Sequence, residues 1–362
     1  MLSRRVAITG FGLISPLGNS VDALWQALTA GRSGVAELEG IDSTGIPTTY
    51  AAAARDFTGS IDDFGELEKQ QSKQIRKGLK IMCRESQMGV ASAQLALSDA
   101  GLKVGQMDPE RSGCLFGSDY MVTLPEDFTA GIKQCLDEQG KFHFDRWAKD
   151  GLPRVTPLWL LMYLPNMPAS HVAIYNDLRG PNNSITEREA SGNLAIGEAF
   201  FTISRGSADV LVAGATGTRI HPMKFAHALL QEEIANGEFP PERACRPFDK
   251  NRSGAVLGEG SAAMVLEEFD HAEKRGATIH GEVIGRSSSA VADVDSRPDV
   301  TVALINAMRG TLRDAKLKPE EIGHIHAHGI STRDGDRQEA AAIAAVFGEG
   351  KCPVVAAKSY FG

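Results

Sequence analysis

The stretch RVAITGFG (Arg5–Gly12), followed closely by SPLG (Ser15–Gly18), opens the chain and decides its fold class. Val6–Thr9 is a short apolar run of the kind that forms a strand buried on both faces. The two glycines that come next predict that the strand ends in a tight turn. Ser20 can then cap a helix. A buried strand followed at once by a helix is typical of layered α/β proteins.

The same alternation continues to the end of the chain. Segments that fit buried strands are 112–117, 210–214, 262–267, 283–285, 322–327 and 354–356. Segments with helical spacing are 81–100, 194–203, 270–275, 302–315 and 338–346. Residues 33–75 are polar and irregular and predict a surface excursion, while residues 118–165 predict an inserted cap of loops and helices. The alternation predicts a layered fold rich in parallel strands, and its two similar rounds, before and after about residue 250, suggest a duplication.

Composition limits the class of function. The chain has 362 residues, 42% of them hydrophobic, and a net charge of −8, so we expect neither nucleic acid nor an anionic membrane as a partner. Its five cysteines are scattered without a CxxC pair, and no signal-peptide pattern opens the chain. We therefore expect free thiols and a cytoplasmic protein. Nucleotide-binding and hydrolase motifs such as GxGxxG, GxxxxGK[ST], HExxH and GxSxG do not occur, and no cofactor is expected.

Three histidines form one candidate metal site. His324, His326 and His328 alternate along a predicted strand, so they would face the same side, where they could ligate zinc. A metal site also needs neighbouring ligands and groups that orient them, and the sequence around these histidines offers none. We therefore expect no metal, and we expect that only His328, at the strand end, faces a site.

Several short motifs, taken together, resemble those of the β-ketoacyl-acyl-carrier-protein synthase family, the thiolase-like condensing enzymes. The resemblance extends from Arg5 to the last residue. Besides the two opening stretches, it rests on GPN (180–182), SG (191–192), AIG (195–197), ADV (208–210), AG (213–214), RPFD (246–249), GEG (258–260), AHG (327–329), ST (331–332), Asp336, Glu339, KS (358–359) and Gly362. Each motif alone is weak, but their order and spacing are highly specific.

The resemblance implies a thiolase-like α/β fold with five layers, α/β/α/β/α, built by duplication and usually dimeric. It divides the chain into an N-terminal half, residues 1–250, that contains the inserted cap, and an incomplete C-terminal half, residues 251–362. The final strands of the family, its glycine-rich loop and a second histidine would follow Gly362. We therefore expect the C-terminal part of the fold to be missing from this sequence.

The resemblance also implies a set of site residues. Members of this family transfer an acyl chain to a cysteine at a helix N-terminus, where the helix dipole favours the thiolate. Glu189 occupies the position of that nucleophile, and an acyl-glutamate would be an anhydride, too reactive to serve as a carrier. His328 and Lys358 match a catalytic histidine and its lysine. Thr332 matches a residue that binds the pantetheine arm of the substrate, and Ile330 replaces a threonine there. Asp336 and Glu339 match residues that support the site.

These departures favour a non-condensing protein of fatty acid or polyketide biosynthesis, similar to a chain-length factor. Such a protein would pair with an active synthase or with itself and meet an acyl carrier protein. The alternatives are a decarboxylase of malonyl-acyl-carrier protein, a 3-oxoacyl-acyl-carrier-protein synthase as the overall resemblance suggests, and an inactive binding remnant. From the residues alone, Glu189 could also be an ordinary acidic residue in a first helical turn.

Overall fold

The computed structural model describes residues 4–38, 48–235, 237 and 239–362. Its centre is a six-stranded sheet with the order β5-β4-β6-β7-β1-β8. The strands are β1 (Val6–Ile14), β4 (Ser112–Ser118), β5 (Asn182–Ile185), β6 (Val210–Thr218), β7 (Glu259–Glu268) and β8 (Gly281–Val283). Two small sheets pair β2 (Ala36–Glu37) with β3 (Tyr50–Ala51), and β9 (Ile325–His326) with β10 (Val354–Val355).

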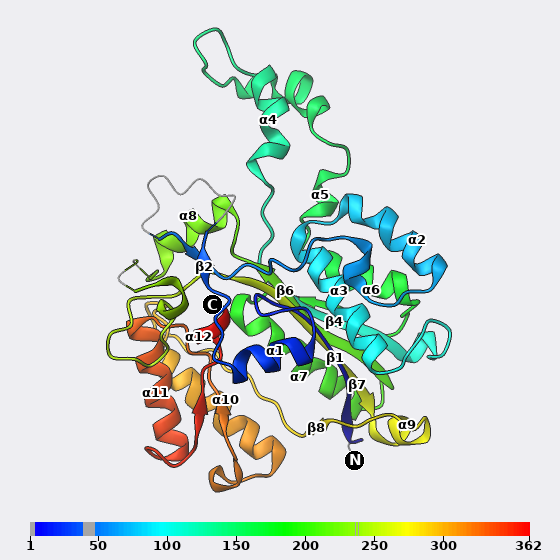
Figure 1. Ribbon diagram of the computed structural model, residues 1–362, viewed down its shortest axis with the longest axis vertical. Helices are drawn as coiled ribbons and strands as arrows, with labels where there is room; N and C mark the ends of the chain where they lie inside the picture. The colour runs from blue at the N-terminus through cyan, green and yellow to red at the C-terminus, as the bar shows by residue number, and fades with distance from the viewer. Residues whose placement is uncertain (1–3, 39–47, 236, 238) are drawn as a thin grey trace.

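Helices cover both faces of the central sheet (Figure 1). The first helices are α1 (Val21–Thr29), α2 (Lys69–Gly78), α3 (Arg84–Asp99), α4 (Pro125–Gln134), α5 (Trp159–Met162) and α6 (Met167–Asn176). The later ones are α7 (Ser191–Ser204), α8 (Pro222–Gln231), α9 (Phe269–Lys274), α10 (Val300–Ala315), α11 (Arg333–Phe347) and α12 (Lys358–Phe361). α4 belongs to an arm that projects from the body of the molecule (Figure 1) and lies within residues 118–165, for which the sequence analysis expected an inserted cap.

The two faces of the sheet bury alternate residues of the same strand. In β6, Val210 and Val212 join α3 and α6 in the largest apolar core, whereas Leu211 and Ala213 pack against α7 on the other face. Because side chains alternate along a strand, a strand covered on both sides contains a nearly continuous apolar run. This explains why the apolar runs of the sequence identified the central strands.

The first strand is longer than predicted, and the turn expected at its glycines is wrong. β1 runs through Gly10 and Gly12 to Ile14. The strand contains glycine at these two positions because α3 crosses it very closely there. A Cβ atom on Gly12 would lie 2.0 Å from the carbonyl oxygen of Ser92, and one on Gly10 would lie 2.5 Å from that of Ala96. The glycines therefore allow close helix–strand packing and do not end the strand.

The surface excursion expected for residues 33–75 is also wrong for its described part, while residues 39–47 lie outside the described residues. Phe57, Phe64 and Ile75 are fully buried in the main core. Short helical turns and α2 bury them, and such short elements leave no clear period in the sequence. This segment closes one side of the core.

The expectation of a parallel-rich sheet holds for only part of the central sheet. β4 pairs in parallel with β5 and β6, but β7 pairs antiparallel with β6 and β1, and β1 pairs antiparallel with β8. Both kinds of strand are apolar when both faces are covered, so the sequence pattern cannot distinguish them. β7 follows the predicted division at residue 250 and yet belongs to the first sheet, and the division itself stays a prediction.

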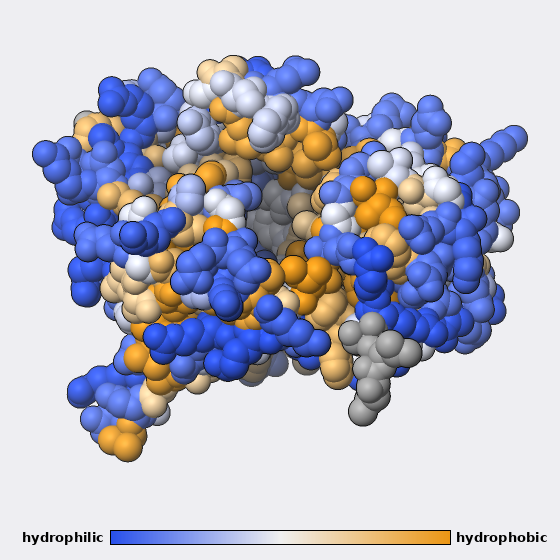
Figure 2. Space-filling view, turned by 90° about the horizontal axis from the view of Figure 1, so that it is seen from below, coloured by the Kyte–Doolittle hydropathy of each residue, from blue (hydrophilic) through white to orange (hydrophobic). Residues whose placement is uncertain are grey.

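The segments after β8 form a second, smaller unit. α10 and α11 pack against each other, and β9 and β10 form a parallel pair. The strand expected over residues 322–327 is limited to Ile325 and His326. Among the described residues, no helix is long and apolar enough to cross a membrane. Figure 2 shows a hollow in one face of the molecule, with hydrophobic residues around it.

Candidate functional site

The loop after β9 carries His328, and two carboxylates hold its backbone. Glu339, in the second turn of α11, accepts hydrogen bonds from the backbone N–H groups of His328 at 2.7 Å and Gly329 at 2.9 Å. Asp336 is buried and accepts from the N–H groups of Ile330 and Ser331, both at 3.1 Å. Bonds from two or more N–H groups to a charged acceptor are among the stronger hydrogen bonds of a protein. The two acidic residues therefore fix the loop that presents His328.

The other residues of this loop separate into two environments. Ile330 lines the pocket described below, whereas Thr332 is 9% exposed and immediately precedes α11 as its N-cap. Asp336 also accepts a 2.7 Å hydrogen bond from the N–H group of Phe248, which ties the RPFD motif to the same loop. Asp336 thus joins two segments that lie 88 residues apart in the sequence.

Lys358 lies against His328 at the start of α12. Its Nζ atom is 3.2 Å from Nδ1 of His328 and donates a 2.9 Å hydrogen bond to the carbonyl oxygen of the same residue. Burial lowers the pKa of Lys358, and burial together with the nearby lysine charge lowers the pKa of His328. Burial and the lysine charge both favour a neutral imidazole of His328 at neutral pH. A neutral histidine can donate a hydrogen bond from its protonated ring nitrogen to the carbonyl oxygen of a ligand.

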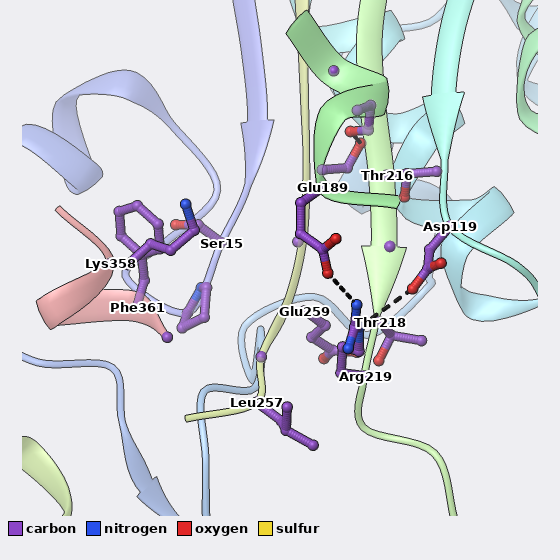
Figure 3. A pocket seen from close by; sticks show the side chains of 18 of the residues that line it. Ser15, Asp119, Glu189, Thr216, Thr218, Arg219, Leu257, Glu259, Lys358 and Phe361 are labelled. Atoms are coloured by element: carbon purple, nitrogen blue, oxygen red, sulfur yellow. Dashed lines mark hydrogen bonds and ion pairs between the residues drawn. The ribbon is translucent and has the colours of Figure 1, made fainter. Parts of the chain in front are cut away.

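Glu189 lies in the short turn η7 (Arg188–Ala190), directly before α7. The residue before it, Arg188, has a positive φ of 51°, a conformation that few residues other than glycine adopt readily. The Glu189 side chain is 44% exposed and points into the pocket, where it meets Arg219 (Figure 3). The turn thus presents one carboxylate at the N-terminal end of a 14-residue helix, a position that suits a negative charge.

Arg219 is the residue that the sequence analysis missed. It follows the end of β6, and its guanidinium group pairs with Glu189, with Glu232 at 2.9 Å and with Asp119 at 3.3 Å. Figure 3 shows Asp119 and Glu189 approaching it from different strands and turns. Arg188 joins the cluster by its 2.5 Å ion pair with Glu232. The one available signal was the position of Arg219 at a strand end, where the side chains of adjacent strands converge.

A second ion pair supports the strand that carries Arg219. Lys224 is completely buried; its Nζ atom is 2.9 Å from the carboxylate of Glu85 and donates a 3.0 Å hydrogen bond to the carbonyl oxygen of Thr218. Thr216 donates a 2.7 Å hydrogen bond to the carbonyl oxygen of Glu85. A buried charge pair is tolerated only when its remaining groups are hydrogen-bonded, as they are here. The end of β6 is therefore fixed to α3 and α8.

These groups border a single pocket of about 830 Å³. One wall is polar and contains Asp119, Arg188, Glu189, Arg219 and Glu232. Another is apolar and contains Leu13, Ile14, Pro16, Leu24, Val256, Leu257 and Phe361. The structure thus brings the expected residues Glu189, Ile330, His328 and Lys358 to one pocket, while Asp336 and Glu339 act behind it. A pocket with an apolar wall and a few polar groups is suited to a small molecule with an acyl chain.

Cys245 is the one cysteine that lines this pocket. It is only 5% exposed, and burial raises the pKa of its thiol to about 12. A thiolate is the reactive form of cysteine, so this thiol is a poor nucleophile at neutral pH. The described histidines, cysteines and carboxylates form no group of three that could hold a metal ion.

Such a fold, with a histidine–lysine pair beside a pocket, defines the class of thiolase-like condensing enzymes and their relatives. Residues 3–272 match the family model "Beta-ketoacyl synthase, N-terminal domain", and residues 280–362 match "Beta-ketoacyl synthase, C-terminal domain". The chain therefore belongs to the β-ketoacyl synthase family of fatty acid or polyketide biosynthesis.

Similar curated proteins include two bacterial enzymes named 3-oxoacyl-[acyl-carrier-protein] synthase 2. The protein from Coxiella burnetii is 36% identical over 96% of this chain and 78% of its own length. The protein from Vibrio cholerae is 34% identical over the same shares of the two chains. Each therefore resembles this chain over nearly all of its 362 residues.

Solved structures agree with this assignment. A β-ketoacyl synthase from Burkholderia phymatum has a TM-score of 0.81 at 30% identity and covers 99% of this chain and 82% of its own. The ishigamide ketosynthase/chain length factor has a TM-score of 0.78 at 27% identity with the same coverage. The likeness confirms the thiolase-like α/β fold and extends to a structure that includes a chain length factor.

Proposed function

We propose that this protein is a non-condensing, chain-length-factor-like partner of an active β-ketoacyl synthase. The observation that carries the proposal is the carboxylate of Glu189, held by Arg219 before α7, where the family resemblance expects the nucleophilic cysteine. A carboxylate paired with a guanidinium group is a weak nucleophile, and its acyl product would be an anhydride. The buried Cys245 offers no substitute.

The central sheet supports a partner on its open edge. β5 is the last strand of the described sheet and pairs there only with β4. An exposed sheet edge can add a strand from another chain. Both the chain-length-factor relative and the acyl-carrier complex named "AntDE:AntF", which has a TM-score of 0.78 at 25% identity, come from assemblies of a ketosynthase with a second protein. We therefore propose a synthase subunit and an acyl carrier protein as partners.

Co-expression tests this proposal. The chain would be produced together with a synthase that retains the family cysteine, and the purified species would be weighed by native mass spectrometry. A heterodimer is the expected result. If both chains form only homodimers over a range of concentrations, the proposed partnership is wrong.

A second candidate function is decarboxylation of malonyl-acyl-carrier protein. The contact between His328 and Lys358 favours it, because a neutral histidine can bind the thioester oxygen on which negative charge develops. The negative charge of Glu189 opposes it, since that charge would repel the malonyl carboxylate. Release of carbon dioxide that His328→Ala abolishes would establish this activity, and wild-type protein that releases none would exclude it.

A further inference from the structure

The polar wall of the pocket is built around the guanidinium group of Arg219. The two terminal nitrogens of Arg219 bind different carboxylates: Nη2 donates to Glu189, and Nη1 donates to Glu232 at 2.9 Å. Its side chain is only 16% exposed, so each N–H group that lost its acceptor would be left poorly hydrated. Arg219 is thus a fixed, largely buried donor of the kind that recognises carboxylates in a planar geometry.

The three carboxylates around Arg219 are not equally placed. All three line the pocket, but the side chains of Asp119 and Glu232 are only 12% and 20% exposed, whereas that of Glu189 is 44% exposed. Among the described residues, its polar contacts are with Arg219 and, more distantly, with Arg188 at 3.6 Å. Glu189 is therefore the one member of the set that a molecule from the pocket could replace.

The charges of this cluster also indicate that Glu189 is the replaceable member. The two guanidinium groups of Arg188 and Arg219 face three carboxylates, which leaves the cluster with a surplus negative charge. Without Glu189 the charges are equal, and the pocket-facing nitrogen of Arg219 has no acceptor. The N-terminal end of α7 adds a favourable potential for an anion at the same place.

We propose that the polar wall is a carboxylate-binding site that the protein's own Glu189 fills. The ligand class is a small carboxylate, or the free carboxyl group of a dicarboxylic acyl chain that enters the pocket. Such a group binds Arg219 when the Glu189 side chain turns away, so Glu189 acts as an internal competitor and an autoinhibitory contact. This proposal does not depend on the partner proposed above.

Chemical rescue of a variant that lacks the Glu189 carboxylate tests this proposal. The full chain with Glu189→Ala lacks the atoms that acetate can supply, and acetate would be titrated into it by calorimetry and by thermal unfolding. Sodium chloride at equal ionic strength controls for screening, and neutral acetamide controls for shape. In Glu189→Ala we expect a saturable rise in the unfolding temperature with acetate alone. The rise should be much smaller in wild-type protein, where Glu189 competes for Arg219, and in Glu189→Gln, whose amide still fills the site.

Two further variants complete the test. Glu189→Ala combined with Arg219→Gln should bind acetate at least about tenfold more weakly than Glu189→Ala. Glu189→Gly should prefer propionate to acetate, because propionate supplies the additional carbon, and this variant serves if Glu189→Ala is poorly folded. The proposal is overturned if acetamide replaces acetate, if wild-type protein responds equally, or if neither alanine nor glycine variant shows saturable binding.

Discussion

Nζ of Lys358 contacts His328 twice, at 3.2 Å from the ring nitrogen Nδ1 and at 2.9 Å from the backbone carbonyl oxygen. The second contact holds the ammonium group in place whatever the protonation state of the imidazole ring. The lysine charge therefore acts on the imidazole at a fixed distance. Burial is the larger cause of the lowered pKa of His328, and the lysine charge adds to it.

The first prediction follows from this contact. Replacing Lys358 with Met removes the positive charge and leaves Glu339 nearby, so the pKa of His328 should rise toward its ordinary value. Titration of the ring by NMR measures this directly. Lys358→Arg keeps the charge and should leave the pKa of His328 low, and equal titration curves for the Met variant and the wild type would contradict the prediction.

Arg219 should stabilise the fold as well as the site. Arg219→Gln leaves Asp119, Glu189 and Glu232 close together without their shared cation, which should lower the free energy of unfolding by about 1–3 kcal/mol. Urea denaturation measures the loss. Combining Arg219→Gln with Glu189→Gln should recover part of it, because one of the repelling charges is gone. If the double variant is less stable than the single one, repulsion is not the cause.

His171 predicts how stability depends on pH. Burial lowers the pKa of this 4% exposed residue to about 4, whereas the unfolded chain has an ordinary value of about 6.5. The unfolded state therefore binds the proton first, so this contribution to stability is complete above about pH 6.5 and is lost as the pH falls toward about 4. Between pH 7.5 and 5 the loss should be about 2 kcal/mol.

The matched variant is His171→Phe, which keeps an aromatic ring against Tyr175 and cannot take up a proton. Urea denaturation at the two pH values should show a smaller loss of stability in this variant than in the wild type. An identical loss in both proteins would assign the acid sensitivity to other groups.

The close contact of β1 with α3 predicts a strong effect of a single methyl group. Gly12→Ala would place Cβ 2.0 Å from the carbonyl oxygen of Ser92, so the helix must move, at a cost of about 1–3 kcal/mol or more. Gly323→Ala is the control, since nothing lies within 4 Å of its Cβ position. A Gly12→Ala protein that unfolds at the same urea concentration as the control would show that the helix yields freely.

Sequence reasoning located most of the elements and several residues of the pocket. It succeeded for strands covered on both faces, such as β6, because burial on both faces favours a continuous apolar run, here residues 210–214. It failed at Gly12, because a glycine needed for close packing and a glycine needed for a turn look alike in sequence. It also missed Arg219, whose partners Asp119, Glu189 and Glu232 are brought together only by the fold.

The electrostatics before α7 predict how a cysteine would behave at the position of Glu189. A thiol introduced by Glu189→Cys would lie at the N-terminal end of a long helix and next to Arg219, and both favour the thiolate, so its pKa should fall below the ordinary value of about 8.5. Alkylation by iodoacetamide at a series of pH values, followed site by site by mass spectrometry, measures that pKa, and the buried Cys245 should react far more slowly. Glu189→Cys combined with Arg219→Gln keeps the helix and removes the guanidinium group, so its alkylation should shift to higher pH. If the two variants share one pH profile, Arg219 does not stabilise a negative charge on the thiol at this position.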